Sequence, residues 1–382
     1  MSQGSSRERP TCGAWGPLSI TDRSAAREGL PLAPSVYAAT AWDRSLARHR
    51  ARVGSIGVRA VTITVQEPSG KLTTSRAELR EPDQGEVLVE VASSGVNRAD
   101  LLQRAGNYPP PPGAPEWPGL EISGIVRRLG PGVSSRRVGE PVLALLEGGG
   151  YADHVVVRAS QTMPLPAGVP LVDAGGLPEA VCTTWANVVD AGRLRPGETL
   201  LVHGGSGGVG SIAVQVGAAL GARVVTTAGG PDRAARCRDL GADVVVDHRT
   251  EDVVEAVRDA TGGRGADVVL DVLGGGGLQD NVRALAPGGR LVVIGLQRGR
   301  RGELDLGALM AKQAVVTGTT LRPRSADQKA RLVSDVVEHV WPMIEAGQVR
   351  PVVHARVPFA DAETAHTLME SGEVFGKVLL IP

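Results

Sequence analysis

The chain has 382 residues, of which 42% are hydrophobic and 21% charged, with 41 basic and 41 acidic side chains. The zero formal net charge provides no overall basic field that would attract nucleic acid or an anionic membrane surface. Cys12, Cys182 and Cys237 lie far apart, so the sequence has no disulfide framework and no cysteine-based zinc motif. No segment has the apolar length of a secretory signal or a membrane span, and we expect a cytoplasmic protein.

The first segment, residues 1–57, is rich in Ser, Arg, Gly and Pro and lacks sustained apolar periodicity. Two interpretations remain open for it: a disordered extension, or upstream sequence translated from a start codon placed too early. The run VRAVTITV, which begins at Val58, then predicts the first strand of a folded domain.

Short β-patterned runs follow up to about residue 157, including VLVEVASSGV and ADHVVV, and Gly/Pro turns separate them. This spacing is typical of a small β-barrel-like domain and not of βαβ units. From about residue 175 to 320, strands alternate with helical segments, as in TLLVHGG followed by SIAVQVGAALG. That alternation predicts a doubly wound parallel sheet with helices on both faces. A long helical pattern and a terminal strand, GKVLLIP, close the chain, and we expect them to complete the first domain.

The turn HGGSGGVG joins a predicted strand to a predicted helix and contains G-x-G-x-x-G at Gly205, Gly207 and Gly210. The first glycine permits the tight turn, the second lets the backbone approach a pyrophosphate, and the third allows close packing of helix on strand. The free N–H groups and the positive end of the helix attract phosphate. The sequence therefore predicts a dinucleotide site at this turn.

The second strand of the same unit ends in VVTTAGG, with no Asp or Glu at Ala228 or Gly229. An NAD site normally places an acidic residue there to bind the ribose hydroxyls. Arg233 follows on the next helix, and a guanidinium favours the additional phosphate of NADPH. The alternative is that Arg233 is a solvated helix residue, with Asp232 weakening the positive field. We predict NADPH rather than NADH.

Four long segments, in the order in which they occur, carry a resemblance to a known family: GVNRADLLQRAGNYPPPPGAPEWPGLEISG, LPEAVCTTWANVVDAGRLRPGETLLVHGGSGGVG, LGADVVVDHRTEDVVEAVRDATGGRGADVVLDVLGG and TGTTLRPRSADQKA. Residues 58–382 resemble the zinc-free quinone oxidoreductases of the medium-chain dehydrogenase/reductase superfamily, the zeta-crystallin-like group. The resemblance implies a GroES-like catalytic domain over 58–178 and 321–382, split around a Rossmann domain over 179–320. It also implies NADPH, hydride or electron delivery to a quinone or an activated alkene, and a homodimer.

The resemblance further implies roles for single residues. Asn97 and Tyr108 would line the nicotinamide side of the site. The cofactor contacts that it implies are Ser206, Gly207, Gly208 and Val209 at the pyrophosphate, Gly229, Gly230, Arg233 and His248 at the adenosine ribose phosphate, Leu273, Gly274, Gly275, Ile294, Gly295 and Leu296 at the ribose and nicotinamide, and Lys377 close to the cofactor. His248 replaces a Tyr of the relatives, and GGGGLQD lacks their usual aromatic residue, so we expect a wider pocket near Gly276.

Zinc-dependent relatives hold a catalytic metal at positions where this chain has Asn97, Leu120 beside Glu121, and Glu179. These residues do not supply the three ligands that a catalytic zinc needs, and we predict no metal site. Without a Lewis acid, alcohol oxidation is disfavoured, whereas a quinone or an enone accepts hydride through its own conjugation. Tyr108 is our candidate for donating a hydrogen bond to the developing oxyanion, unless its ring only packs on the adjacent prolines.

Three functions remain in competition. The first is an NADPH-dependent quinone oxidoreductase, and the second is a reductase of α,β-unsaturated carbonyls such as enones or enoyl thioesters. A thioester substrate needs basic residues at the mouth of the site, for which Arg322 and Arg324 are candidates. The third is an NADPH-binding sensor without turnover. The lack of interleaved basic and aromatic residues argues against RNA binding.

Three further polar residues have less specific interpretations. We expect Cys182 to be a buried structural cysteine, because no His occurs in its local pattern. His203 is predicted to pack beneath the cofactor. For Asp271, a polar anchor at the end of its strand and a contact to the cofactor ribose are equally open.

Overall fold

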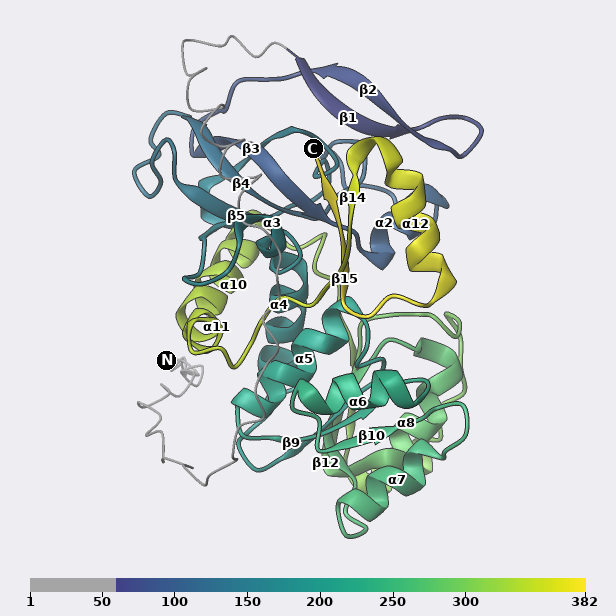
Figure 1. The fold of residues 1–382 in the computed structure, drawn as a ribbon. Coiled ribbons are helices and arrows are strands. Elements are labelled where there is room, and N and C mark those ends of the chain that lie inside the picture. The colour runs from purple at the N-terminus through teal and green to yellow at the C-terminus, as the bar shows by residue number, and fades with distance from the viewer. Residues whose placement is uncertain (1–59) are drawn as a thin grey trace, which may run out of the picture. The chain divides into compact units, whose positions relative to one another are not determined.

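The structure is a computed structural model that describes residues 60–382, so both interpretations of residues 1–57 lie outside it. The described chain forms a two-stranded, a seven-stranded and a six-stranded sheet, which Figure 1 shows with the helices that surround them. The two-stranded sheet consists of β1 (Ala60–Gln66) and β2 (Leu72–Glu78), paired antiparallel.

The seven-stranded sheet combines five strands from the N-terminal half of the chain with the last two strands. Its order is β14-β15-β3-β4-β5-β7, with β6 paired to β3. The strands are β3 (Glu86–Gly95), β4 (Glu121–Leu129), β5 (Pro141–Leu145), β6 (His154–Arg158), β7 (Thr162–Pro164), β14 (Val353–Pro358) and β15 (Lys377–Ile381). The last strand, β15, runs antiparallel to β3, with Leu379 opposite Gly95. This pairing places the C-terminal strand beside residues that precede it by more than half the chain.

The six-stranded sheet is parallel throughout and has the order β10-β9-β8-β11-β12-β13. Its strands are β8 (Thr199–Val202), β9 (Arg223–Thr227), β10 (Val244–Val246), β11 (Ala266–Asp271), β12 (Leu285–Val293) and β13 (Val315–Gly318). The order reverses between β8 and β11, and ligands bind outside the carboxyl ends of the strands at such a reversal. The predicted doubly wound sheet is confirmed.

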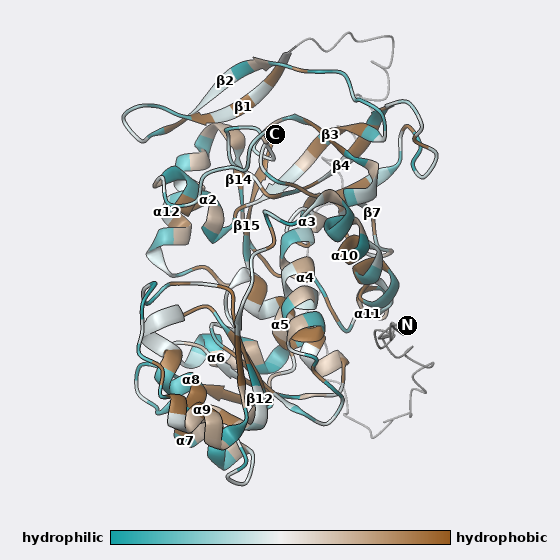
Figure 2. Cartoon of the chain, turned by 180° about the vertical axis from the view of Figure 1, so that it is seen from behind, coloured by the Kyte–Doolittle hydropathy of each residue, from teal (hydrophilic) through white to brown (hydrophobic). Residues whose placement is uncertain are grey.

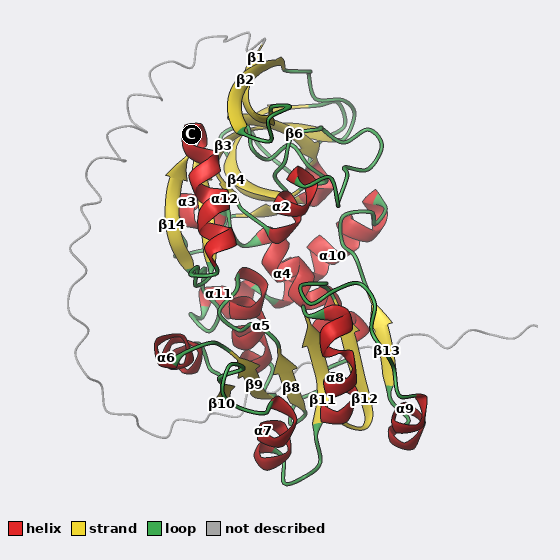
Figure 3. Cartoon of the chain, turned by 90° about the vertical axis from the view of Figure 1, so that its right-hand side faces the viewer, coloured by secondary structure: helices red, strands yellow, loops and turns green. Residues whose placement is uncertain are grey.

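Helices cover both faces of this sheet, as Figure 3 shows. Successive strand residues point to opposite faces, so Leu200 joins the core under α5 (Gly208–Ala219) and α6 (Pro231–Asp239). Leu201 joins the other core, under α7 (Val253–Ala260) and α8 (Leu278–Ala284). Figure 2 shows brown, apolar stretches of strand among these helices, and every residue of β11 is buried, as expected for a strand covered on both faces. The helix α9 (Leu306–Lys312) connects β12 to β13, the strand at one edge of this sheet.

The remaining helices lie mostly around the seven-stranded sheet. They are α2 (Arg98–Arg104), α3 (Leu171–Ala174), α4 (Pro178–Thr184), a π-helical continuation (Trp185–Ala191), α10 (Ala326–His339), α11 (Trp341–Glu345) and α12 (Ala362–Ser371). Short 3-10 turns occupy Ala159–Gln161, Gly274–Gly277 and Phe359–Asp361. None of the helices in residues 60–382 is both long and apolar enough to cross a bilayer.

One hydrophobic core connects the two large sheets. It contains Leu143 of β5, Val181 of α4, Ile212 of α5 and Val336 of α10, all nearly inaccessible to solvent. Trp341 is 4% exposed in the same core and donates its indole N–H to the carbonyl of Pro164. Because α4 and α5 share this core, the start of α4 has a defined place beside the glycine turn.

Candidate functional site

The glycine turn between β8 and α5 packs as a dinucleotide-binding turn requires. A Cβ at Gly205 would lie 2.2 Å from Oγ1 of Thr226, and one at Gly210 would lie 2.0 Å from the carbonyl oxygen of Gly204. Both positions are therefore too close to neighbouring atoms for a side chain. At Gly207 the nearest atom to such a Cβ is 3.4 Å away, which leaves space beside the first turn of α5. That space and the free N–H groups of the helix suit a pyrophosphate.

The end of β9 carries basic groups where the adenosine ribose phosphate is predicted to bind. The Arg249 guanidinium packs against Gly229, because a Cβ there would lie 2.7 Å from Nε of Arg249. Arg233 instead donates through Nη2 to the carbonyl of Gly372, at 2.5 Å. Partial burial, followed by Arg298 and Arg249, lowers the pKa of His248 against the opposing effect of Asp247. His248 is therefore a neutral ring at physiological pH in a cluster of arginines.

Arg249 was not among the site residues predicted from the sequence. It stands immediately after His248 in DHRT, at the end of β10, and no motif singles it out. The parallel register pairs Val246 of β10 with Thr227 of β9, which brings the residues that follow both strands together. The sequence signal that could have identified Arg249 is a basic residue shortly after β10, the third strand of the parallel sheet in chain order.

Asp271 acts as an anchor at the end of β11. Its two carboxylate oxygens accept hydrogen bonds from the backbone N–H groups of Leu273, at 2.8 Å, and Gly274, at 2.9 Å. The residue is fully buried. Of the two interpretations that were open, the structure favours the polar anchor, because both oxygens already have backbone donors.

The loops that follow β11 and β12 lie side by side. The N–H of Ile294 donates to the carbonyl of Asp271 at 2.7 Å, and a Cβ at Gly295 would lie 2.8 Å from the carbonyl oxygen of Val272. Leu296 is 53% exposed beside Gly274. These predicted cofactor contacts are thus gathered at the carboxyl ends of adjacent strands.

The expectation of a wider pocket near Gly276 stays a prediction: a hollow of about 800 Å³ is lined by Gly299, Arg300 and Arg301, while the glycine backbone lies close to that same loop. A Cβ at Gly275 would lie 2.0 Å from the carbonyl oxygen of Arg301, and one at Gly276 would lie 2.7 Å from that of Arg298. Backbone N–H groups of both glycines donate to carbonyls of the same loop. The consecutive glycines therefore allow two backbone segments to approach closely.

Lys377, Glu121 and Asn97 form a buried polar triad from β15, β4 and the residue that precedes α2. The ammonium of Lys377 lies 2.5 Å from Oε1 of Glu121 and donates to Oδ1 of Asn97 at 2.7 Å. Asn97 donates through Nδ2 to the same Glu121 oxygen at 2.9 Å. A Cβ at Gly208 would lie 2.6 Å from Cδ of Lys377, so the lysine stem packs directly on the glycine turn.

Two more carboxyl groups lie near this triad. Burial raises the pKa of Asp100 to about 6, although the N–H groups of Asn97 and Gly119 donate to it and lower the pKa. Burial and then the charge of Glu121 raise the pKa of Glu179 to about 8. Glu121 itself accepts hydrogen bonds from Lys377, Asn97 and the N–H of Glu179.

Tyr108 lies under the guanidinium of Arg322, whose central carbon is 5.3 Å from the centre of the phenol ring. Arg322 donates to the carbonyls of Tyr108 and Glu147 and to the side chain of Gln103. Burial, followed by the charge of Glu179, raises the pKa of Tyr108, so its hydroxyl remains protonated. No residue in 60–382 forms a hydrogen bond with that hydroxyl, which leaves it available as a donor.

Arg322 is therefore not a basic group at the mouth of the site. It is 5% exposed, and its donors are used by the segment that carries Tyr108. The other two singled-out residues are also buried: burial raises the pKa of Cys182 well above its usual range, and His203 contacts Oδ1 of Asn281 at 2.6 Å. Within the described chain, no group of three His, Cys, Asp or Glu side chains is arranged to hold a metal ion.

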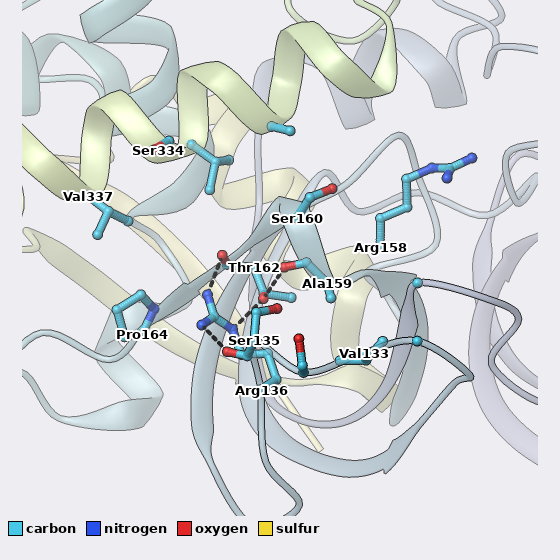
Figure 4. Close-up of a pocket in the computed structure, with 15 residues that line it drawn as sticks. Val133, Ser135, Arg136, Arg158, Ala159, Ser160, Thr162, Pro164, Ser334 and Val337 are labelled. Atoms are coloured by element: carbon cyan, nitrogen blue, oxygen red, sulfur yellow. Dashed lines mark hydrogen bonds between the residues drawn. The ribbon is translucent and has the colours of Figure 1, made fainter.

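A hollow of about 700 Å³ lies elsewhere, between the loop at 132–136, β7 and α10 (Figure 4). None of the predicted site residues lines it. The guanidinium of Arg136 already donates to Oγ1 and the carbonyl of Thr162 and to the carbonyl of Ser135. We therefore assign the site to the ends of the parallel strands and not to this hollow.

Two sequence families match the chain: "Alcohol dehydrogenase GroES-like domain" over residues 83–167 and "Zinc-binding dehydrogenase" over residues 208–336. The chain is 32% identical over 324 residues to one of the subunits of the phenolphthiocerol/phthiocerol polyketide synthase of Mycobacterium tuberculosis. That match covers 84% of this chain, and the chain spans only 15% of the length of that relative.

Solved structures match over nearly their whole length. The Escherichia coli quinone oxidoreductase complexed with NADPH has 29% identity and a TM-score of 0.75, over 84% of this chain and 99% of that one. A mycobacterial quinone oxidoreductase has 30% identity and a TM-score of 0.74, over 85% of this chain and 100% of that one. These matches confirm the predicted combination of a GroES-like domain and a Rossmann parallel sheet.

We predict that Lys377→Met lowers the free energy of unfolding by about 3–5 kcal/mol, because it leaves the Glu121 carboxylate buried without its partner. The double variant Lys377→Met/Glu121→Gln removes both charges and should recover most of that loss. Urea unfolding of the wild type, both single variants and the double variant measures the coupling. Single-variant losses that simply add in the double variant would contradict a buried ion pair.

Proposed function

The chain belongs to the medium-chain dehydrogenase/reductase superfamily, and from this premise we propose that it is an NADPH-dependent oxidoreductase that reduces a quinone. The observation that carries the proposal is the contact between the glycine turn and the buried triad. Because Lys377 packs on Gly208 and holds Asn97, the turn predicted to bind the cofactor lies beside the residues predicted to line the nicotinamide.

The choice of NADPH over NADH is supported by the charge at the end of β9. Arg249 packs on Gly229, and Arg233 lies in the first turn of the next helix, α6. No acidic residue stands at 228–230. A guanidinium beside this strand end suits a phosphate on the adenosine ribose. The Escherichia coli neighbour was solved with NADPH, which agrees with this assignment.

Bound NADPH would supply a hydride, and the protein would supply position and charge. The N-terminal turn of α5 would hold the pyrophosphate, and the loops after β11 and β12 would present backbone groups to the ribose and nicotinamide. The hydroxyl of Tyr108, protonated and without a hydrogen-bond partner within residues 60–382, would donate a hydrogen bond to the oxygen on which negative charge develops. Asn97 has its amide fixed by Glu121 and Lys377, so its orientation does not depend on the substrate.

A second candidate is the reduction of an α,β-unsaturated carbonyl, because the same hydride geometry serves both acceptors. The similarity to a segment of a polyketide synthase favours it. The buried position of Arg322 weighs against an acyl thioester substrate, because Arg322 is one of the two arginines expected to be exposed at the mouth of the site. A sensor without turnover is the third candidate, and an acceptor assay separates all three.

We expect the purified protein to oxidise NADPH in the presence of ortho- or para-quinones, because a quinone needs no metal to accept hydride. The measurement is the loss of NADPH absorbance with a matched panel of quinones, small enones and an enoyl thioester. Turnover restricted to enones or thioesters would replace the quinone assignment with the second candidate. Tight NADPH binding without oxidation by any acceptor would favour the sensor.

We predict that Arg249→Ala raises the KM for NADPH by about 10–100-fold, the effect of losing one charge-assisted hydrogen bond, and leaves the KM for NADH nearly unchanged. Arg233→Ala should have the smaller effect, because that guanidinium already donates to Gly372. Arg238→Ala, an exposed change on the same helix α6, is the control. Equal losses for NADPH and NADH in Arg249→Ala would contradict a phosphate contact.

We also propose that two copies associate through the β13 edge of the parallel sheet. The outer side of β13 has no strand partner in residues 60–382, and Val315 on it is 53% exposed. Leu306 and Met310 of α9 are 62% and 75% exposed. An unpaired edge beside exposed apolar side chains is a suitable surface for strand pairing with a second copy.

We expect light scattering to give a molar mass near twice 39.5 kDa for the wild type. Met310→Glu should shift the protein toward the monomer, because the dimer would bury the new charge in an apolar contact. Val138→Glu is the matched control, since Val138 is 61% exposed and lies outside this edge. A monomeric wild type, or a dimer insensitive to Met310→Glu, would contradict this interface.

A further inference from the structure

Glu179 is a buried carboxyl group that the mechanism above does not use. It lies in the first turn of α4, and its backbone N–H donates to Oε2 of Glu121 at 2.9 Å. Its own carboxyl oxygen has only a long contact, 3.5 Å, from Oγ1 of Thr183. Among residues 60–382, no cation or backbone N–H forms a hydrogen bond with this carboxyl group, although the charges of Lys377 and Lys329 act on it from further away.

Charged and titratable groups from several elements act on Glu179: Glu121 of β4, Asp100 of α2, Lys377 of β15, Lys329 of α10, and Tyr108, Cys182 and Arg322 nearby. The cations among them already have partners. Lys377 pairs with Glu121 at 2.5 Å, and Lys329 pairs with Glu147 at 2.7 Å. Burial and the charge of Glu121 consequently raise the pKa of Glu179 to about 8, and the group is protonated at neutral pH.

The position of Glu179 relates it to the predicted acceptor site. Its charge is among the causes that raise the pKa of Tyr108. Its backbone is bonded to Glu121, which holds Asn97 and Lys377. The side chain is partly accessible although it is surrounded by protein. Through Glu121, Glu179 is therefore connected to Asn97, one of the two residues predicted to line the nicotinamide side.

We propose that Glu179 is the proton donor that completes reduction of the acceptor at this site. The inference rests on the proposed function, because it requires hydride transfer from NADPH. Hydride addition leaves the anion of a hydroquinone or an enolate. The O–H bond of the Glu179 carboxyl breaks, its proton bonds to that anion, and the electron pair stays on the Glu179 carboxylate. Solvent then returns the proton, so that acceptor, NADPH and one proton give the reduced acceptor and NADP⁺.

Tyr108 and Glu179 have different tasks in this scheme. The pKa of Tyr108 is raised from its usual value, so the phenol keeps its proton and donates a hydrogen bond. Glu179 loses and regains a proton in each cycle, which is efficient when the pKa of the donor lies near the working pH.

The test is Glu179→Gln, which keeps the shape of the side chain and removes its acidic proton. We expect kcat for the best acceptor to fall by about 100-fold or more, with the NADPH Kd unchanged. The wild-type kcat should decline above about pH 8 as Glu179 ionises, and this decline should be absent from Glu179→Gln and retained in Glu179→Asp. Tyr108→Phe should lower kcat and keep the decline. The control is Glu370→Gln, an exposed residue of α12.

Thermal unfolding provides a readout independent of turnover. The folded protein keeps Glu179 protonated up to about pH 8, whereas the unfolded chain ionises it near its ordinary pKa of about 4.3. The wild type should therefore lose stability relative to Glu179→Gln as the pH rises from about 5 to 8. If the Tm difference between the wild type and Glu179→Gln does not change between about pH 5 and 8, the conclusion that Glu179 is protonated in the folded protein is overturned.

The kinetic outcomes separate this proposal from the proposed function. A wild type that oxidises NADPH with none of the acceptors overturns both. A wild type that turns over, with Glu179→Gln within about twofold of its kcat at every pH, overturns only the role of Glu179. A large loss in Glu179→Gln that keeps the decline above about pH 8 also overturns it, because another group would then supply the proton.

Discussion

The buried ion pair between Lys377 and Glu121 is the interaction on which the site depends. It joins the last strand of the chain to β4, and through Asn97 it also fixes the start of α2. The lysine stem packs on Gly208 in the turn between β8 and α5. A buried pair of this kind is not a large source of stability, because desolvation offsets most of the Coulomb attraction. Its value here is positional, since one side chain connects the turn predicted to bind the cofactor with the seven-stranded sheet.

The balance of charge around that pair determines the state of its neighbours. Three carboxyl groups, those of Asp100, Glu121 and Glu179, lie near the Lys377 ammonium, which Glu121 holds at 2.5 Å. Asp100 receives compensation from backbone N–H groups, and its pKa rises only to about 6. No backbone N–H of residues 60–382 donates to the Glu179 carboxyl group, and burial and the charge of Glu121 raise its pKa to about 8. Local hydrogen-bond donors, rather than burial alone, thus distinguish two carboxyl groups that are both enclosed by protein.

Several features of the site follow from residues that are close in sequence. The G-x-G-x-x-G turn is local, and the structure shows why Gly205 and Gly210 tolerate no side chain. Other features depend on long-range packing, and the structure arranges some of them differently from what the sequence predicted. Arg322 is buried against the segment of Tyr108 and is not at the mouth of the site, and Gly275 and Gly276 allow the backbone at 298–301 to approach theirs closely. Arg249 escaped notice because its relevance depends on the register of two parallel strands.

The sequence by itself determined the doubly wound sheet, the glycine turn and the family resemblance, because periodicity and turn chemistry act over short stretches of chain. Only the tertiary structure decided which side chains meet. Lys377 and Asn97 are 280 positions apart, and β15 must pair with β3 before they come within 2.7 Å. The protonated state of Glu179 depends on groups from β4, α2, β15 and α10 together. Such encounters are set by packing at long sequence separation, which no local pattern encodes.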